Sequence, residues 1–311
     1  MGRKYYDPEQ RQTVVEHVRN RLFRKPVPKF PRTIVIETQF GCNGSCVFCQ
    51  YPQIKDQLPR GKMTMELFEK IARDCSGQNV ERFILCLDNE PLLDQKLAER
   101  YALLRRHCPK AIRNLTTNAS LLTLEKVEQL ISSGLINELF LSVNGESKEV
   151  YEELMGLPYE KVMANLETLC KWLTAHPAIR KNLRVRVNTV KTQRVAPEIP
   201  AMTRRWEAEG FEMHVIDMDS RGDQLDLQKL SAEELKPNVR CRRPFHTMVI
   251  TWEGDAVICC VDYKREVKLG NVQKHSLTEV WNSERAIKLR QEHLSGDFGN
   301  LPPCAQCKVN G

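Results

Sequence analysis

Strand-like and helix-like segments alternate through most of this 311-residue chain, and this alternation constrains the fold more than any other feature. Short β-branched runs predict six strands, at residues 33–37, 82–87, 112–117, 138–143, 183–190 and 212–218. Between them, apolar residues at three-to-four spacing predict helices at 64–75, 92–107, 122–133, 148–175 and 197–210. Such alternation implies parallel strands joined by right-handed crossovers. The expected fold class is therefore α/β.

The two ends of the chain differ from this pattern. Residues 7–23 predict a polar helix, which a Pro-containing linker follows. From Cys241 the pattern becomes a β-hairpin, with strands at 247–252 and 256–260 joined by a Glu-Gly-Asp turn. We therefore expect three parts: an N-terminal helix and linker (1–30), a β/α barrel (31–230) and a small C-terminal domain (231–311).

Composition narrows the class of protein. The chain shows no signal-peptide core and no run of about 18 apolar residues, which predicts a cytoplasmic protein without a membrane partner. The net charge of +7 is dispersed, so a nucleic-acid substrate is not indicated. Twelve cysteines in a reducing compartment point to metal binding or catalysis rather than to disulfides. Four of them stand singly among apolar residues and are expected to be buried core thiols: Cys75, Cys86, Cys108 and Cys170.

The first cysteine group, Cys42, Cys46 and Cys49, directly follows the first predicted strand. Its C-x3-C-x2-C spacing therefore lies in a loop at the carboxyl end of a strand, where barrels of this kind place their chemistry. Three thiolates can hold three corners of a four-iron cluster and leave the fourth iron open. A structural zinc site needs four ligands and typically uses C-x2-C pairs, so zinc fits this loop poorly.

This loop resembles that of the radical SAM superfamily in its spacing, in the aromatic Phe48 before the third cysteine, and in the strand that precedes it. The resemblance implies a partial (β/α)6 TIM-like barrel and S-adenosyl-L-methionine (SAM) bound to the open iron. It also implies that one electron, from a donor such as flavodoxin or ferredoxin, cleaves SAM to methionine and a 5′-deoxyadenosyl radical. That radical abstracts hydrogen from a substrate carbon, while the protein positions the reacting atoms.

Further positions are similar to the SAM-contacting residues of this family. Asp88-Asn89-Glu90-Pro91 ends the second predicted strand and resembles a Gly-Gly-Glu-Pro segment that contacts the SAM amino group, with both glycines replaced and Glu90 retained. Four polar residues at or near strand ends resemble those that hold the carboxylate and ribose of SAM: Asn118, Ser142, Asn144 and Asn188. For each of them alone, a strand-end cap or turn residue is the alternative.

The second cysteine group contains Cys241, Cys259, Cys260, Cys304 and Cys307. Four thiolates can bind either zinc or a complete iron–sulfur cluster, and spacing alone leaves both open. The surrounding segments 241–245, 252–260, 270–272 and 276–283 resemble the SPASM/twitch domains of radical SAM enzymes, in the shorter twitch form with one auxiliary cluster. The resemblance implies two [4Fe–4S] clusters in all, the second one bound by Cys241, Cys259, Cys304 and Cys307.

Cys260 is then left over. If Cys259 and Cys260 lie on one hairpin strand, their side chains face opposite ways and cannot easily serve one cluster. Cys260 is either an inert buried thiol, a ligand exchanged with Cys259, or a hydrogen-atom donor that faces the substrate. The last role resembles that of twitch-type epimerases acting on sugars or peptides, because delivery of hydrogen from the opposite face inverts a stereocentre.

Two alternatives remain. In a twitch-type alcohol dehydrogenase, the substrate radical loses a proton and passes an electron to the auxiliary cluster, and Arg221, Asp217 or Asp219 could act as base or positioning residue. Alternatively, these three residues are charged side chains on a surface loop without a catalytic role. In another class, a non-enzymatic zinc-binding interaction protein would explain the C-terminal cysteines but not a three-cysteine loop inside a β/α barrel.

The substrate class follows only loosely from the sequence. Acidic residues near strand ends (Asp88, Asp217, Asp219 and Asp223) could meet the amino groups of an aminosugar or aminocyclitol. A peptide substrate is equally compatible with the fold. Either substrate would be typical of natural-product biosynthesis, including that of antibiotics.

Overall fold

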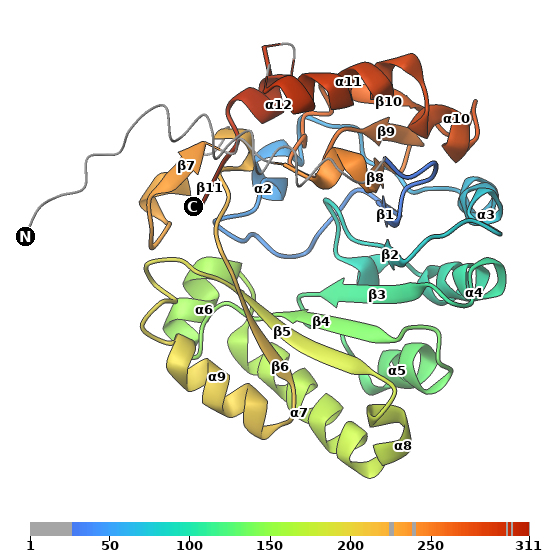
Figure 1. Cartoon of the computed structure of the whole chain (residues 1–311). Helices are drawn as coiled ribbons and strands as arrows, with labels where there is room; N and C mark the ends of the chain where they lie inside the picture. Colours follow the sequence, from blue (N-terminus) through green and yellow to red (C-terminus); the bar gives the residue numbers. More distant parts are fainter. Residues whose placement is uncertain (1–26, 224–226, 238–240, 297, 300, 311) are drawn as a thin grey trace, which may run out of the picture.

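The computed structural model describes residues 27–223, 227–237, 241–296, 298–299 and 301–310, so the helix expected at 7–23 lies outside the described residues. Six parallel strands follow one another in chain order and form a curved sheet (Figure 1): β1 (Thr33–Ile36), β2 (Arg82–Ile84), β3 (Ile112–Thr117), β4 (Glu138–Ser142), β5 (Arg184–Val190) and β6 (Glu212–Ile216). All six strands expected from the sequence are confirmed, and the α/β fold is a partial barrel of the TIM type.

The helices connect these strands and cover the outer side of the sheet (Figure 1). The longer ones are α3 (Met65–Asp74), α4 (Leu97–His107), α6 (Lys148–Met155), α7 (Tyr159–Ala175) and α9 (Ile199–Ala208). The shorter ones are α2 (Tyr51–Ile54), α5 (Leu124–Val127), which continues as a π-helical turn (Glu128–Ser132), and α8 (Pro177–Arg180). Short 3₁₀ helices lie at Pro91–Leu93, Arg221–Asp223, Leu227–Lys229 and Arg243–Phe245.

One predicted helix is two helices in the structure. The helical pattern at 148–175 is interrupted because Gly156 ends α6 with a left-handed φ of 60°, and Pro158 caps the start of α7. A side chain at position 156 would meet the cysteine loop, since a Cβ there would lie 1.9 Å from Ser45 Oγ. Glycine therefore both ends α6 and allows the cysteine loop to pack against its end.

The C-terminal hairpin joins the barrel sheet. Strand β9 (Asp255–Val257) pairs antiparallel with both β8 (Thr247–Ile250) and β10 (Lys268–Asn271), and β8 pairs in parallel with β1. The result is one nine-stranded sheet in the order β10-β9-β8-β1-β2-β3-β4-β5-β6. Helices α10 (Leu277–Trp281), α11 (Glu284–Ser295) and α12 (Pro302–Ala305) pack beyond it, while β7 (Leu235–Pro237) and β11 (Lys308–Asn310) form a separate pair.

The hairpin corrects one sequence-based argument. Strand β9 ends at Val257, so Cys259 and Cys260 lie in the following loop and not on the strand predicted at 256–260. The rule that neighbouring residues of a strand face opposite ways therefore does not apply to this pair.

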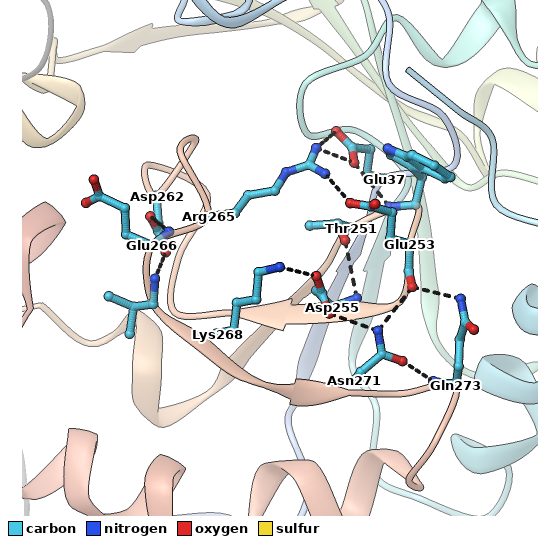
Figure 2. A network of polar contacts seen from close by, with 12 residues as sticks. Glu37, Thr251, Glu253, Asp255, Asp262, Arg265, Glu266, Lys268, Asn271 and Gln273 are labelled. Carbon is cyan, nitrogen blue, oxygen red and sulfur yellow. Dashed lines mark hydrogen bonds and ion pairs between the residues drawn. The ribbon is translucent and has the colours of Figure 1, made fainter. Parts of the chain in front are cut away.

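Arg265 binds the hairpin to the end of β1 (Figure 2). Its guanidinium lies 2.9 and 3.1 Å from the two carboxylate oxygens of Glu37 and 3.2 Å from Glu253. Glu37 directly follows β1, whereas Glu253 lies in the β8–β9 turn, and the Trp252 N–H also donates to Glu37. Burial raises the pKa of Glu37 to about 8, although the charge of Arg265 opposes this rise. The network therefore holds a buried carboxylate at the entrance to the first cysteine loop.

Most apolar residues form one core between the sheet and the helices, with a smaller cluster under the C-terminal segment around Ile258, Val261 and Leu289. Cys75, Cys108 and Cys170 belong to the main core, as expected. Over the described residues, the structure has no helix of the length and apolar character needed to cross a membrane.

Candidate active site

The first cysteine loop leaves the carboxyl end of β1 and is held on two sides. On one side, Gly41 exchanges backbone hydrogen bonds with the loop after β2, at 3.2 Å to Asp88 O and 2.9 Å from Glu90 N. On the other side, the backbone N–H of Ser45 donates to Met155 O at 3.1 Å, at the end of α6. These contacts hold Cys42, Cys46 and Cys49 at the carboxyl ends of the barrel strands.

The three thiols of this loop lie near one another and are half-buried. Burial raises the pKa of Cys42 to about 12, and it raises those of Cys46 and Cys49 as well, with the neighbouring thiols adding to the shift of Cys46. Two backbone N–H groups donate to sulfur, from Gly44 to Cys42 at 3.3 Å and from Tyr51 to Cys49 at 3.4 Å. Such N–H···S contacts accompany thiolate ligands of iron–sulfur clusters, so the loop fits a cluster with one open iron.

Cys86 departs from expectation. It is only half-buried and stands outside the core clusters, whereas the sequence predicted a core thiol. Its thiol lies close enough to Cys42, Cys49 and Glu90 for their charges to raise its pKa, after the larger effect of burial. The apolar run at 82–87 predicted a buried strand to its end, but β2 ends at Ile84 and Cys86 falls in the loop beside the cluster-binding thiols.

Glu90, one of the predicted SAM-contacting residues, is buried and accepts three hydrogen bonds. Its carboxylate accepts from Thr117 Oγ1 at 2.6 Å, Asn118 N at 2.9 Å and Leu92 N at 3.0 Å. Asn118 in turn donates to Asn43 Oδ1 at 3.0 Å, inside the first cysteine loop. Glu90 therefore links the ends of β2 and β3 to that loop. Sequence reasoning missed Asn43, because a polar residue between two cysteines gives no separate signal.

We expect Glu90→Gln to lower the free energy of unfolding by about 1–3 kcal/mol. Glutamine replaces one carboxylate oxygen by an NH2 group, which cannot accept the hydrogen bonds that Glu90 now receives. Urea unfolding of both proteins measures the difference. The exposed Glu81, which pairs with Arg32 at 2.9 Å, supplies the control. If Glu81→Gln were equally destabilising, the buried hydrogen bonds of Glu90 would not be the cause.

The other predicted SAM-contacting residues divide into two kinds. Asn89 and Asn144 bond within the protein, Asn89 to the backbone of Leu87 at 2.8 Å and Asn144 to the backbone of Val190 at 2.6 Å. Ser142 and Asn188 are register partners at the carboxyl ends of β4 and β5. Asn188 Oδ1 is buried and has no hydrogen-bond partner among the described residues. A buried polar atom without a hydrogen-bond partner is consistent with a site that binds a polar ligand such as SAM.

The second cysteine group surrounds a cavity. Its lining includes Cys241, Cys259, Cys304 and Cys307 together with His293, but not Cys260. These are the four thiols that the sequence predicted as ligands, so the arrangement fits a group bound by four thiolates. In the part of the chain that the structure describes, no three His, Cys, Asp or Glu side chains have the spacing of ligands around a single metal ion. The evidence for a bound cluster is therefore that the four cysteines line one cavity and that thiolates are the usual ligands of iron–sulfur clusters.

Cys260 lies between the first cysteine loop and the four-thiol cavity, and contacts a residue beside each. Its carbonyl is 3.5 Å from Gln50 Nε2, which also donates to Asp88 Oδ1 at 2.9 Å, and Gln50 directly follows Cys49. On its other side, Arg243 Nη1 contacts both Cys260 Sγ at 3.4 Å and Cys259 Sγ at 3.5 Å. The sequence did not single out Gln50 or Arg243. Gln50 directly follows Cys49 and Arg243 lies two residues after Cys241, but only the fold brings them to Cys260.

The remaining candidates lie at the end of β6. Asp217, Asp219 and Arg221 line a small cavity together with Phe48 of the first cysteine loop. The Arg221 guanidinium is 3.3 Å from Asp219, and its charge acts on the thiols of both Cys49 and Cys260. Burial raises the pKa of Asp88 to about 6, and Arg221 is among the charges that oppose this rise. Arg221 thus lies near a thiol of each cysteine group.

Comparison with known sequences finds two domains in this chain. The sequence profile described as the Radical SAM superfamily matches residues 36–172, and that of SPASM, an iron–sulfur cluster-binding domain, matches residues 241–308. A curated relative, the S-adenosyl-L-methionine-dependent 2-deoxy-scyllo-inosamine dehydrogenase of Niallia circulans, is 20% identical over 279 residues. That match covers 88% of this chain and 91% of the relative.

Solved structures with the same fold include enzymes of different specificity. BtrN in complex with AdoMet and 2-DOIA superposes with a TM-score of 0.63 at 18% identity, over 90% of this chain and 94% of BtrN. SuiB of Streptococcus suis bound to the precursor peptide SuiA gives 0.69 at 17% identity, over 93% and 73%. AnSMEcpe with bound AdoMet gives 0.63 at 17% identity, over 84% of each chain. At these identities the similarity shows a shared fold.

Proposed function

We propose that this chain, which belongs to the radical SAM superfamily and carries a SPASM iron–sulfur domain, is a radical SAM epimerase that uses Cys260 as its hydrogen-atom donor. The chain is a radical SAM enzyme, and its cofactors are SAM, a [4Fe–4S] cluster and an additional cluster in the SPASM domain. The observation that carries the finer proposal is the position of Cys260: it does not line the four-thiol cavity, its carbonyl accepts from Gln50 Nε2 at 3.5 Å, and its thiol is close enough to Asp88 to influence the pKa of that carboxyl.

Within this proposal, residues 31–230 form the barrel and residues 231–311 the auxiliary domain. Cys42, Cys46 and Cys49 hold the first cluster, and Glu90, Asn118, Ser142, Asn144 and Asn188 surround SAM, with Asp88 and Asn89 in the adjoining loop. When bound, the first cluster and SAM supply the one-electron chemistry that removes a hydrogen atom from a substrate carbon. The remaining step, return of a hydrogen atom to the substrate carbon, would be carried out by a side chain of this protein.

Cys260 would complete the reaction by giving its thiol hydrogen to the opposite face of the substrate carbon. The S–H bond breaks, a new C–H bond forms, and the sulfur is left one electron short. An electron from the external one-electron reductant and a proton then restore the thiol. Arg243, which contacts both thiols of the 259–260 pair, would hold the Cys260 thiol in place beside the four-thiol cavity.

A dehydrogenase is the second candidate, and a specific observation favours it. The curated relative that spans 88% of this chain is named a dehydrogenase. In that reaction the substrate loses a second electron and a proton to give a ketone. Arg221 could then position the substrate hydroxyl, and Asp219, at 3.3 Å from Arg221, or Asp217 in the same cavity could accept its proton while the electron passes to the auxiliary cluster.

The substrate proposal is an aminocyclitol or aminoglycoside, with a peptide as the other class. The buried Asp88 supports an amine-bearing substrate, since a carboxylate shielded from water is stabilised by a cationic partner. Proteins of the same fold were solved with either 2-DOIA or the peptide SuiA. A flavodoxin or ferredoxin donor and a cytoplasmic location stay predictions.

Turnover in deuterated water separates the two reactions. The reconstituted enzyme is incubated anaerobically with reductant, SAM and either 2-deoxy-scyllo-inosamine or a panel of aminoglycosides, and products are analysed by mass spectrometry and NMR. An epimerase should deliver one deuterium from the exchanged thiol to the inverted carbon. A product two hydrogens lighter, with a carbonyl group and no deuterium, would instead establish the dehydrogenase.

Cys260→Ala tests the donor role directly. We expect 5′-deoxyadenosine still to form while inversion is lost, because hydrogen abstraction precedes the step that needs the thiol. Cys259→Ala is the matched variant and should remove the auxiliary cluster signal in electron paramagnetic resonance (EPR) spectra. If Cys260→Ala removes that signal and Cys259→Ala does not, the two roles are exchanged and the donor assignment is wrong.

A further inference from the structure

His293 lies at the four-thiol cavity without any hydrogen bond of its own. The side chain is 7% exposed, and neither Nδ1 nor Nε2 has a hydrogen-bond partner among the described residues. The same cavity is lined by Cys241, Cys259, Cys304 and Cys307. Leaving both polar atoms of a buried imidazole unpaired costs free energy, so a residue without function here would be better replaced by an apolar one.

The position of His293 is set by the packing of α11. Arg290, one helical turn earlier, donates to Pro244 O and Trp281 O, both at 2.9 Å, and stacks over the Trp281 ring. The imidazole itself packs edge to face against Phe298, with ring centroids 5.0 Å apart. These contacts hold the ring by its faces and edges, and they supply no acceptor for its N–H group.

We propose that His293 donates an N–H hydrogen bond to the auxiliary iron–sulfur cluster and so raises the reduction potential of that cluster. In either protonation state, at least one ring nitrogen carries a hydrogen. The four cysteines already provide the ligands of a complete cluster, which leaves the imidazole as a neighbour of its sulfur atoms. Hydrogen bonds to cluster sulfur stabilise the reduced, more negative state, and therefore they raise the potential. His293 would thus be a positioning and tuning residue rather than a ligand.

Redox titration followed by EPR tests the proposal on the reconstituted holoenzyme. The auxiliary signal is identified as the one that SAM addition leaves unchanged. His293→Phe should keep this signal and shift its midpoint potential to a more negative value, while His293→Gln, which retains an amide N–H, should shift it less. His275→Phe is the control, because it replaces an exposed imidazole of the same domain that does not line this cavity. It should leave the potential unchanged.

The wild-type protein provides a second test that does not depend on a variant loading its cluster. With ¹⁵N-labelled histidine, electron–nuclear double resonance should show a weak ¹⁵N coupling to the auxiliary cluster. Absence of coupling would overturn the proposal, and so would the strong coupling of a nitrogen bonded directly to iron. An unchanged potential in His293→Phe would overturn it as well. None of these readouts depends on whether the reaction is epimerisation or oxidation.

Discussion

Cys46→Ala should abolish reductive cleavage of SAM while about four of about eight irons per chain remain bound. The reason is that the three thiols of the first loop provide all protein ligands of one four-iron cluster, while Cys241, Cys259, Cys304 and Cys307 line a separate cavity. Iron and sulfide quantification of the anaerobically reconstituted variant, together with a reductant-driven assay for 5′-deoxyadenosine, measures both effects. We expect the same result for Cys42→Ala and Cys49→Ala.

Cys86→Ala is the sharpest control for this experiment. Its thiol lies close enough to Cys42 and Cys49 to feel their charges, but it falls outside the C-x3-C-x2-C loop. It should therefore keep full iron content and SAM cleavage. Loss of four irons on removal of Cys86 would show that the first site uses a fourth thiol and has no open iron. Zinc in place of iron would overturn both cluster assignments.

Arg265→Met should lower the free energy of unfolding by about 1–3 kcal/mol, because the carboxyl groups of Glu37 and Glu253 lose the guanidinium that donates to them. The side chains of Arg265 and Glu37 are 5% and 0% exposed, and a second carboxylate, Glu253, completes the network (Figure 2). Methionine fills a similar volume but leaves Glu37 buried without its cation. Anaerobic urea unfolding of the reconstituted protein measures the loss.

An exposed ion pair of this chain gives the matched control. Arg194 and Glu153 lie 2.8 Å apart with side chains 54% and 50% exposed, so Arg194→Met should cost less than about 1 kcal/mol. Adding Glu37→Gln to Arg265→Met should change the free energy of unfolding little further, because burial raises the pKa of Glu37 to about 8 and the carboxyl is neutral at pH 7 once Arg265 is removed. Equal effects of Arg265→Met and Arg194→Met would show that the buried network does not hold the hairpin to β1.

Much of the barrel was predictable because its signals are local. Each of the six strands is a short β-branched run between helical patterns, and parallel pairing in chain order follows from the crossovers. Helix boundaries were less predictable, since Gly156 and Pro158 divide one apolar pattern into α6 and α7. The predicted end of the second hairpin strand was also wrong, because β9 ends at Val257 and not at residue 260. The argument that placed Cys259 and Cys260 on opposite faces of that strand was therefore wrong as well.

By itself the sequence determined the α/β alternation, the two cysteine groups and their separation along the chain, because residue type and spacing along the backbone carry these features. Only the tertiary structure decided that β8 pairs with β1, that Arg265 meets Glu37, and that Gln50 and Arg243 approach Cys260. It also decided that His293 shares a cavity with four thiols. These contacts join residues far apart in the chain, and their partners are selected by packing and burial of charge, which no local pattern encodes.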